Sequence, residues 1–453
     1  MMVTERILVP HDHSQPIGEY SNTIAELYQL EGAESELPIT ITFQVTEDCN
    51  LSCTYCYQIC KSKKHMTLDV AKKTIDIILT DEKYIKVSQR VACILDFIGG
   101  EPLLEIDLIE QIYQYFLKKC FEMNHPWLTR HRISICSNGV LYNTEKVQKF
   151  MSTYGINLSM AITIDGPKEL HDACRIFPDG TGSHDIVEES VKTLRRQVPS
   201  LGTKVTIAPE NLQYLGKSVR YMREELGLTE IHANCTFEGP WHVDNAKLLY
   251  DEMVKLSDYC YDNDTYSTFN ISLFDESGFT GKDYSVDDQN WCGGTGSMFA
   301  VDPDGNFYPC LRYMKSSLGD NVEPYIIGNI DRGVRSSECD KYRCDFLDSI
   351  TATSQSTEEC INCPIAGGCA WCSAYNYQKT GSVNKRVTEI CIMHKARSLA
   401  NVYYWNKFYE KHNVPNVYEN YLPKEDAISI IGEEEYNKLM KLIEDQRKRI
   451  EVK

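Results

Sequence analysis

Three cysteines in one short loop have the spacing that points most directly to chemistry in this sequence. Cys49, Cys53 and Cys56 follow the pattern CxxxCxxC, directly after the apolar run 39–45. A cubane iron–sulfur cluster normally takes four cysteine thiolates, so a loop that supplies three leaves one iron open to a small molecule. A zinc knuckle, or chance clustering in a cysteine-rich chain, is the alternative interpretation of the same three thiols.

Polar and glycine-rich motifs follow at the ends of later strand-like runs. Paired glycines let the backbone approach a ligand closely, hydroxyl and amide side chains suit a ribose, and an arginine fork pairs with a carboxylate through two hydrogen bonds. Taken singly, each motif is also what an ordinary turn contains. The candidate binding residues are Gly99, Gly100, Glu101, Ser137, Asn138, Thr163 and Arg175.

Together with these motifs, the cysteine loop, with Tyr55 before its third cysteine, resembles the signature of the radical S-adenosylmethionine (radical SAM) enzymes. The GGEP motif is similar to the one whose backbone meets the methionyl amine of SAM. The phrase from Thr163 to Arg175 looks like that of radical SAM peptide and sulfatase maturases. The resemblance implies that these two residues bind the SAM carboxylate and that Phe237 lies beside the cofactor. It also implies that the reduced cluster cleaves SAM to a 5′-deoxyadenosyl radical, which abstracts a substrate hydrogen.

Seven of the nine cysteines from residue 292 to residue 391 form a second set of candidate ligands. It contains a lone cysteine, a GxxxxC motif, the run CxxCxxxxxCxxC and a final cysteine, and it resembles the SPASM extension, which holds two auxiliary cubanes. The resemblance implies three [4Fe–4S] clusters in all. The distal auxiliary cluster would take Cys360, Cys363, Cys369 and Cys391. The nearer auxiliary cluster would take Cys292, Cys310 and Cys372.

The second set departs from the SPASM pattern in two places. Two residues separate Cys369 from Cys372, where the family has three, and this leaves the role of Cys372 open. The nearer cluster also lacks a fourth ligand, because Met298 stands where sulfatase maturases carry another cysteine. Cys339, Cys344 or the thiol of a substrate could fill that position.

A structural zinc module is the alternative for this region, because its two CxxC pairs form a tetrathiolate pattern. Zinc would leave the other three cysteines of the set without a role. The remaining cysteines lie mostly in predicted strands and helices, where we expect them to be small core residues.

The numbers of charged residues and cysteines limit the partners and the compartment that we expect for this chain. The 453 residues include 65 acidic and 47 basic side chains, a formal net charge of -18, so neither nucleic acid nor anionic lipid is expected as the main partner. No apolar run is long enough to span a bilayer. An odd total of 19 cysteines, with no secretory signal in residues 1–19, predicts reduced thiols in a cytoplasm.

Strand-like and helix-like runs alternate from residue 39 onward. Six strand–helix units predict an α/β fold with a parallel sheet, an open partial (β/α)6 TIM-like barrel with its motifs at the carboxyl ends of the strands. Thr67 is predicted to cap the first helix, and Asp107 with Glu110 to form a capping box at the second. The predicted strands are 39–45, 91–98, 132–136, 158–164, 204–208 and 230–235. Later predicted helices are 144–154, 184–197, 212–226 and 245–263.

The alternation ends near residue 285, where turns and closely spaced cysteines begin. We therefore expect four parts in this chain. They are an N-terminal arm over 1–38 with a short helix near 22–30, the radical SAM barrel over 39–284, the SPASM domain over 285–394, and C-terminal helices over 395–453.

Two details narrow the expected reaction. Leu311 follows the GxxxxC cysteine where sulfatase maturases place an aspartate base, and the phrase Cys369–Tyr377 looks like maturases of peptides with CXXX repeats. The resemblance therefore favours an enzyme that installs cysteine thioether cross-links in a ribosomally synthesised precursor peptide. The alternatives are another SPASM oxidase, either a carbon–carbon cross-linker or a formylglycine-forming sulfatase maturase, and a zinc-stabilised binding protein.

Beside the precursor peptide, the expected partner is a low-potential electron donor of the flavodoxin or ferredoxin type. The segment before Cys49 is too short for the leader-binding domain fused to many relatives, so that domain is either absent or supplied by a separate protein. The sequence assigns no catalytic proton-handling residue.

Overall fold

The structure is a computed structural model, and it describes residues 38–198, 202–263, 269–276, 278–290 and 292–451. The helix predicted near residues 22–30 lies outside these ranges. Contacts divide the chain into two compact units. The first unit contains the residues up to Ile164, Lys168–Thr203 and Gly293–Ile350. The second unit contains Asp165–Pro167, Lys204–Cys292 and Thr351–Lys453.

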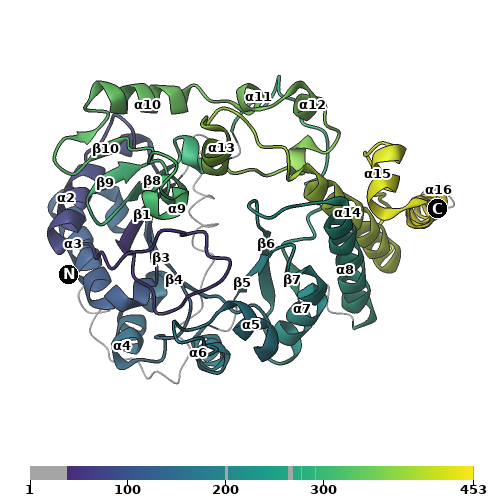
Figure 1. Cartoon of the computed structure of the whole chain (residues 1–453), viewed down its shortest axis with the longest axis horizontal. Helices are drawn as coiled ribbons and strands as arrows, with labels where there is room; N and C mark the ends of the chain where they lie inside the picture. Colours follow the sequence, from purple (N-terminus) through teal and green to yellow (C-terminus); the bar gives the residue numbers. More distant parts are fainter. Residues whose placement is uncertain (1–37, 199–201, 264–268, 277, 291, 452–453) are drawn as a thin grey trace. The chain divides into compact units, whose positions relative to one another are not determined.

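The first unit is built on a sheet whose central strands are parallel (Figure 1). The first four predicted strands all form, each parallel to the next: β1 (Ile39–Thr46), β2 (Cys93–Gly99), β3 (His131–Ser137) and β4 (Leu158–Ile162). The helices that follow them in the chain are α2 (Leu68–Ile78), α3 (Ile106–Glu122), α4 (Glu145–Tyr154), α5 (Lys168–Cys174) and α6 (His184–Gln197). The carboxyl ends of these strands therefore meet at one edge, as the sequence predicted.

Residues from beyond the predicted barrel extend the same sheet. β8 (Met298–Val301) pairs in parallel with β1, and three short strands follow it in antiparallel pairs, which gives the order β11-β10-β9-β8-β1-β2-β3-β4. The added strands and helices are β9 (Asn306–Tyr308), β10 (Gly328–Asn329), β11 (Gly333–Val334), α9 (Lys315–Leu318) and α10 (Glu338–Asp348). The sequence analysis did not predict this extension.

The last two predicted strands form in a separate sheet. β5 (Gly202–Ile207) and β6 (Glu230–Cys235) belong to a three-stranded sheet of order β5-β6-β7, in which β7 (Asn270–Ile271) is parallel to β6. The predicted α/β fold is confirmed. Among the described strands, the larger sheet remains open and no barrel closes.

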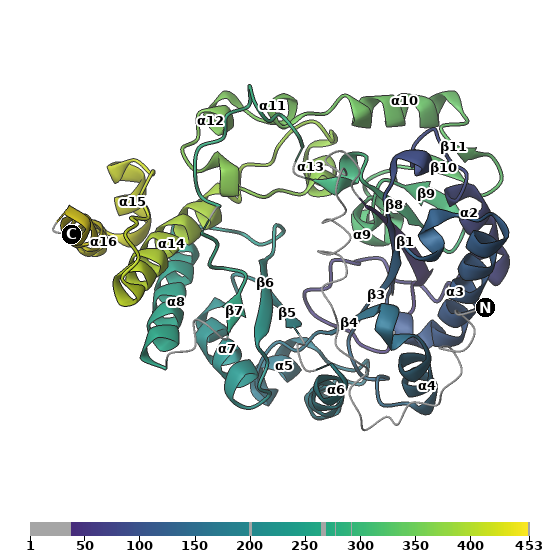
Figure 2. The same ribbon diagram turned by 180° about the vertical axis from the view of Figure 1, so that it is seen from behind.

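Helices make up most of the second unit. α14 (Cys391–His412) packs along α8 (Val243–Asp262), and the hydroxyl of Tyr261 donates to the carbonyl of Tyr404 over 2.7 Å between them (Figure 2). The other helices of this unit are α7 (Leu215–Glu224), α11 (Ala352–Gln355), α12 (Glu358–Ile361), α13 (Ser373–Thr380), α15 (Lys424–Ile431) and α16 (Glu433–Glu451).

The sequence explains these elements in ordinary ways. In β2 alternate side chains face the core, with Cys93 1% exposed and Leu95 and Phe97 fully buried. The predicted cap of α2 is confirmed, because the hydroxyl of Thr67 accepts the Val70 amide at 3.3 Å.

The capping box predicted for α3 is wrong. A 3-10 turn over Pro102–Glu105 leads directly into the helix, and the helix has no side-chain cap at its first turn. Asp107 instead forms an ion pair with Lys146 of α4. Asp107 cannot be the cap because α3 already begins at Ile106, and a capping residue must precede the first helical residue.

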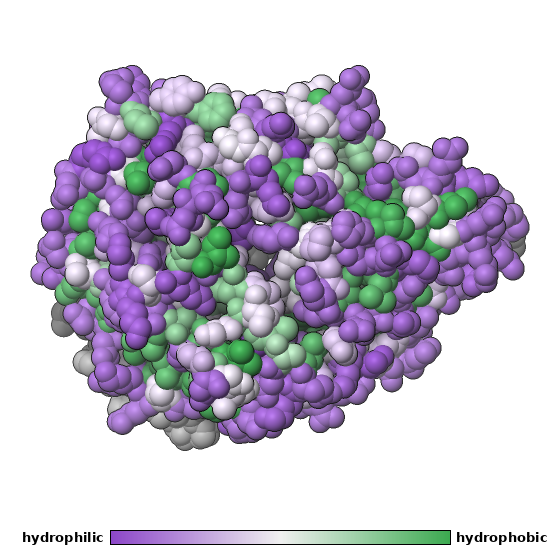
Figure 3. Space-filling view, viewed as in Figure 1, coloured by the Kyte–Doolittle hydropathy of each residue, from purple (hydrophilic) through white to green (hydrophobic). Residues whose placement is uncertain are grey.

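In the described residues, no helix combines the length and the apolar character needed to cross a membrane. Hydrophilic residues predominate on the face drawn in Figure 3, and apolar residues form smaller patches among them. This agrees with a composition in which 25% of the residues are charged.

Candidate functional site

The loop after β1 brings the three cysteines of the CxxxCxxC motif to one lysine. Partial burial lowers the pKa of the Lys61 ammonium group, but the nearby thiolates of Cys56, Cys49 and Cys53 outweigh it and raise that pKa above its ordinary value. Burial raises the pKa of the Cys49 thiol, and Lys61 opposes this shift. The three sulfurs therefore lie within electrostatic reach of a single positive charge.

Backbone pairing places Arg175 beside the middle cysteine of the loop. The amides of Ser52 and Thr54 donate to the carbonyls on either side of Arg175, over 2.7 Å and 3.0 Å. Cys53, between those two donors, consequently lies opposite Arg175, whose Nη1 stands 3.9 Å from the cysteine sulfur. The guanidinium also lies over the ring of Tyr55, 5.3 Å from its centroid. Three residues that the resemblance assigned to the cofactor site are thus brought together.

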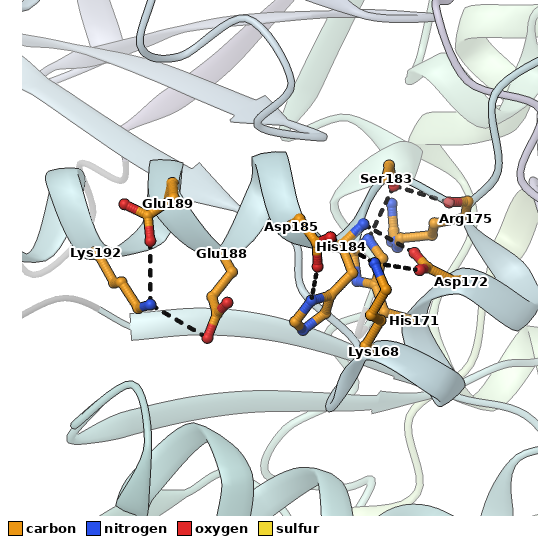
Figure 4. Close-up of polar contacts among 10 residues, drawn as sticks. All are labelled: Lys168, His171, Asp172, Arg175, Ser183, His184, Asp185, Glu188, Glu189 and Lys192. Atoms are coloured by element: carbon orange, nitrogen blue, oxygen red, sulfur yellow. Dashed lines mark hydrogen bonds and ion pairs between the residues drawn. The ribbon is translucent and has the colours of Figure 1, made fainter. Parts of the chain in front are cut away.

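A buried serine–histidine pair holds the backbone of Arg175 (Figure 4). Ser183 Oγ donates to the carbonyl of Arg175 over 2.8 Å. Because this bond uses the only proton of the hydroxyl, Nε2 of His171, 3.0 Å away, must donate to it. Asp172 accepts the amide of His184 at 2.8 Å and so closes the turn between α5 and α6. The arginine is therefore positioned by the packed ends of two helices.

The carboxylate of Glu101 connects the ends of two strands. It accepts the amides of Leu103 at 3.0 Å and Asn138 at 2.8 Å, and the hydroxyl of Ser137 at 2.7 Å. Burial raises the pKa of Glu101, and these hydrogen bonds oppose the shift. The contacts are with protein donors, so this side chain positions the loops after β2 and β3.

The two glycines of the GGEP motif lie against the backbone that leads into Cys49. A Cβ on Gly99 would stand 2.3 Å from the carbonyl oxygen of Thr46, and one on Gly100 only 2.1 Å from that of Asp48. The amide of Gly100 donates to the carbonyl of Thr46 over 3.0 Å. The glycine pair is therefore required for contact with the cysteine loop, in addition to the close ligand approach predicted from sequence.

Asn138 and Thr163 belong to the same edge of the sheet. Nδ2 of Asn138 donates to Oδ1 of Asn50 over 2.7 Å and stands 3.9 Å from the sulfur of Cys49. The amide of Thr163 donates to the carbonyl of Ser137 over 3.0 Å. Two strand ends that the resemblance assigned to SAM are therefore linked to the cysteine loop through the protein's own hydrogen bonds.

The four cysteines assigned to the distal cluster line one cavity. Cys360, Cys363, Cys369 and Cys391 all border a cavity of about 420 Å³ in the second unit. Burial raises the pKa of the Cys369 thiol to about 12, with Arg386 opposing this shift and the other three thiolates adding to it. The predicted distal set thus converges on one space.

The cysteines assigned to the nearer cluster are divided between the units. Cys310 belongs to the first unit, whereas Cys292 and Cys372 belong to the second. Phe237, which was assigned to the SAM site, follows β6 and also belongs to the second unit. Their grouping with residues of the other unit stays a prediction.

The two candidates for a fourth ligand of the nearer cluster differ in burial. Cys344 of α10 is fully buried, and Cys339 is exposed. Burial raises the pKa of Tyr84 well above its ordinary value, and the thiolates of Cys344 and Cys310 add to that shift. Both thiols therefore lie within electrostatic reach of the Tyr84 hydroxyl, and the choice between Cys344 and Cys339 stays a prediction.

Some residues of the site were not singled out by the sequence. The guanidinium of Arg312 lies 5.0 Å from the centroid of the Tyr57 ring. Burial raises the pKa of Tyr57, and Arg312 opposes the shift. Lys61 could have been identified from the sequence, because it lies only five residues after Cys56. The contact between Tyr57 and Arg312 could not, because the two residues are far apart in the chain.

Within the described ranges, no group of three or more His, Cys, Asp or Glu side chains has the arrangement that holds a single metal ion. A cubane binds each of its cysteines at a different iron, so its ligands need not converge on one point. The site residues fit a cluster because the distal thiols line one cavity and because arginines stand beside Cys53 and Cys369.

Comparison with known proteins gives relatives for the first part of the chain. Residues 43–222 match the family model of the Radical SAM superfamily. An uncharacterised protein of Methanocaldococcus jannaschii is 30% identical over 182 residues, 40% of this chain and 57% of that protein. The cysteine-type anaerobic sulfatase-maturating enzyme of Clostridium novyi is 25% identical over 183 residues, 40% of this chain and 46% of that enzyme. The chain therefore spans about half the length of these two relatives.

A longer match involves mycofactocin maturase MftC of Mycobacterium tuberculosis, which is 23% identical over 288 residues, 61% of this chain and 65% of that protein. Among solved structures, native anSMEcpe with bound AdoMet superimposes with a TM-score of 0.58 and 17% identity, over 83% of this chain and 100% of that one. At this identity the likeness concerns the fold alone.

The family match covers β1 to α7 and includes the cysteine loop, Glu101 and Arg175, which the structure brings to one edge of the sheet. Residues 43–222 of this chain match the Radical SAM superfamily model, and the proteins to which the chain is similar include anaerobic sulfatase maturases and mycofactocin maturase.

Proposed function

We propose that this protein is a radical SAM enzyme that modifies a peptide. Its relatives include a sulfatase-maturating enzyme and a maturase, and the fold is also that of anSMEcpe, which has been solved with AdoMet and the Kp18Cys peptide at a TM-score of 0.59 and 17% identity. The acidic chain, with its net charge of -18, suits a peptide more than a nucleic acid. A cytoplasmic location is part of this proposal.

In this proposal Cys49, Cys53 and Cys56 would hold the first cluster, and SAM would bind beside it. Arg175 and Thr163 bind the carboxylate of SAM, the GGEP backbone its amine, and the loop after β3 its ribose. When bound, the cluster and SAM supply a 5′-deoxyadenosyl radical that takes a hydrogen atom from the substrate. The protein's contribution is to place the ligands and exclude water.

Two auxiliary [4Fe–4S] clusters complete the proposal, in a SPASM domain over residues 285–394. The four cysteines around the cavity hold the distal cluster. Cys292, Cys310 and Cys372 hold the nearer one, with Cys344 or a substrate thiol as its fourth ligand. Reduction requires a donor of the flavodoxin or ferredoxin type, and a separate protein would present the leader of the peptide.

The product we propose is a cysteine thioether cross-link. The observation that carries this choice is Leu311, which stands where sulfatase maturases place an aspartate after the GxxxxC cysteine. Without that carboxylate a formylglycine-forming reaction lacks its expected base. An incompletely ligated nearer cluster suits the binding of a peptide thiol, whose sulfur would then join a carbon radical.

A second candidate function is formylglycine formation in a sulfatase. It is favoured by the 25% identity with the Clostridium novyi sulfatase-maturating enzyme over the radical SAM region. A carbon–carbon cross-link is the third product that this fold could support.

Co-expression with a cysteine-containing peptide encoded nearby, followed by mass spectrometry, tests the product. A thioether requires the loss of two hydrogen atoms per cross-link, with each linked cysteine protected from alkylation. Mass loss with freely alkylated thiols rejects the thioether, and reaction of the product with an aldehyde probe assigns formylglycine.

Metal analysis tests whether the protein is an enzyme of this kind at all. Anoxically purified protein with iron and acid-labile sulfide supports the proposal. Protein that contains zinc without sulfide is instead a zinc-stabilised binding protein.

A further inference from the structure

A buried arginine donates directly to a sulfur in the distal cysteine set. Nη2 of Arg386 stands 2.7 Å from Sγ of Cys369 and 3.1 Å from the carbonyl of the same residue. The side chain is 6% exposed, and its guanidinium stacks on the indole of Trp371 at 4.0 Å from the ring centroid. A charge-assisted bond in such a dry environment is strong, because little solvent screens the charge.

The surroundings fix this arginine in one position. The indole nitrogen of Trp371 donates to Oε1 of Gln355 over 2.7 Å, and Nε2 of Gln355 donates to the carbonyl of Val383 over 2.7 Å. The amide of Arg386 donates to the carbonyl of Gln355 over 3.1 Å. Both the stacking ring and the arginine backbone are therefore anchored to one buried glutamine.

Among the described residues that line this cavity, Arg386 is the cation without a carboxylate partner. Lys395 pairs with Asp426 at 2.7 Å. Burial lowers the pKa of His394 to about 3, so its imidazole is neutral, and its Nε2 donates to the carbonyl of Ala370 over 2.8 Å. In the described part of the chain, the hydrogen bonds of Arg386 go to sulfur, carbonyl and hydroxyl acceptors and none to a carboxylate.

We propose that Arg386 raises the reduction potential of the distal cluster bound by Cys360, Cys363, Cys369 and Cys391, an inference that rests on the proposed function. Reduction adds one negative charge to a cluster, and a buried guanidinium on one of its sulfurs stabilises the reduced form more than the oxidised form. Arg386 is thus a positioning and tuning residue and does not touch the substrate.

The tuned potential gives the distal cluster a place in the reaction. Joining a thiol sulfur to a carbon removes two hydrogen atoms: the 5′-deoxyadenosyl radical takes one, and the other leaves as a proton and one electron. A cluster with a raised potential would accept that electron and would pass it to the one-electron carrier protein. The electron count therefore closes with the partners already proposed.

The test is an EPR-monitored redox titration of the anoxic holoenzyme, compared among wild type, Arg386→Gln and Arg386→Lys. Arg386→Gln keeps a hydrogen-bond donor but removes the charge. At the wild-type midpoint potential of the distal cluster we expect the ratio of reduced to oxidised cluster to fall by about tenfold, a shift of about 59 mV to lower potential. Arg386→Lys keeps the charge without the planar stack and should shift less.

The matched control is Arg343→Gln in the first unit. Arg343 stacks on the ring of Tyr325 at 5.3 Å and donates to the carbonyl of Ile326 over 2.9 Å, without a cysteine partner among these contacts. This variant should leave the midpoint potential of the distal cluster unchanged. A shift equal to that of Arg386→Gln would overturn the proposal.

Iron and sulfide content decides the remaining outcomes. Full iron with unchanged potentials in Arg386→Gln refutes the tuning role while leaving the proposed function intact. If Arg386→Gln loses iron, the midpoint potential of the distal cluster is measured in Arg386→Lys instead. A lowered potential in that variant supports the tuning role. An unchanged potential, or a loss of iron from Arg386→Lys as well, refutes the tuning role. Wild-type protein without iron would refute the proposed function itself.

Discussion

Positive charges stand beside the cysteines of the CxxxCxxC loop and beside those of the distal set. Lys61 is shared by the loop cysteines, Arg175 stands beside Cys53, and Arg386 donates to Cys369. Thiolates in partly desolvated sites need such partners, because burial alone favours the protonated thiol. These cations stand beside the cysteines although the chain as a whole has a net charge of -18.

The position of Arg175 depends on a neighbour that does not face the cysteines. Ser183→Ala removes the hydroxyl that binds the Arg175 carbonyl and leaves the buried Nε2 of His171 without this acceptor. An unsatisfied buried donor costs about 1–3 kcal/mol, so we expect SAM to bind about tenfold more weakly while the iron content stays at the wild-type value. Anaerobic equilibrium dialysis with labelled SAM measures this.

Lys192→Ala, on the exposed side of α6 where Lys192 pairs with Glu188 and Glu189, is the control for this variant (Figure 4). It should not alter SAM binding. Wild-type SAM affinity in Ser183→Ala would show that the turn between α5 and α6 does not position Arg175.

At the scale of elements, the end of β2 packs directly against the loop after β1. Gly100→Ala would bring a Cβ to 2.1 Å from the backbone oxygen of Asp48, next to Cys49. The clash is with backbone and cannot be relieved by a side-chain rotation, so the cysteine loop must move. We expect the protein to lose about four irons per chain, the content of one cubane, in iron and sulfide analysis.

Gly281→Ala is the matched control, because the nearest atom to a Cβ there is a carbonyl oxygen at 4.0 Å. It should keep the wild-type iron content. Retention of all the iron by Gly100→Ala would mean that the loop tolerates displacement and that contact with the glycine pair does not shape the first site.

β3 also contains a histidine that is neutral in the folded state. Nδ1 of His131 donates to the carbonyl of Trp127 over 2.7 Å, so Nε2 accepts the hydroxyl of Tyr113 at 2.8 Å. Burial lowers the pKa of His131, although the bond to Trp127 raises it in part. Between this lowered pKa and the unfolded value of about 6.5, the unfolded chain binds more protons.

The contribution of His131 is therefore present above about pH 6.5 and lost as the pH falls through its folded-state pKa. We expect the urea midpoint of the wild type to fall more between about pH 7 and pH 5 than that of His131→Gln, which cannot titrate. His232→Gln, at an exposed position of β6 in the second unit, should keep the wild-type slope. Parallel slopes in wild type and His131→Gln would contradict the assignment.

Elements with a clear period were predictable from sequence. The alternation in β2 and the Thr67 cap of α2 located both elements to within about two residues. β8 escaped prediction because four residues, Met298–Val301, are too short to show a pattern and pair with a strand far away in the chain. The prediction of a capping box at Asp107 failed because the preceding 3-10 turn starts α3 one residue earlier, at Ile106.

The same distinction holds within the candidate site. Cysteine spacing singled out the CxxxCxxC loop, and the resemblance to the SPASM extension implied the distal set, whose role as cluster ligands stays a prediction. Arg386 and Ser183 could not be predicted as partners of Cys369 and Arg175, because only the folded chain brings them within hydrogen-bond distance. Local patterns therefore identify candidate ligands, whereas long-range contacts, which a local pattern does not contain, determine which side chains surround them.

At the scale of the whole molecule, the two thiol sets lie in different units. The CxxxCxxC loop, Arg175 and Glu101 belong to the first unit, and the distal cysteines belong to the second. Under the proposed function, cleavage of SAM needs only the first set, whereas a finished product also needs an acceptor for the electron that leaves the peptide. The two activities should therefore be separable by mutation.

Cys53→Ala and Cys363→Ala test this division in the whole enzyme. Cys53→Ala should abolish SAM cleavage and product together, because the first cluster loses a ligand and Arg175 its neighbour. Cys363→Ala should keep measurable, uncoupled formation of 5′-deoxyadenosine in chromatography, while mass spectrometry detects no modified peptide. Cys120→Ala and Cys260→Ala, at buried positions of α3 and α8, are the controls and should retain both activities. Equal loss of cleavage in Cys53→Ala and Cys363→Ala would contradict the division, since it would mean that the distal cysteines are needed for the first chemical step.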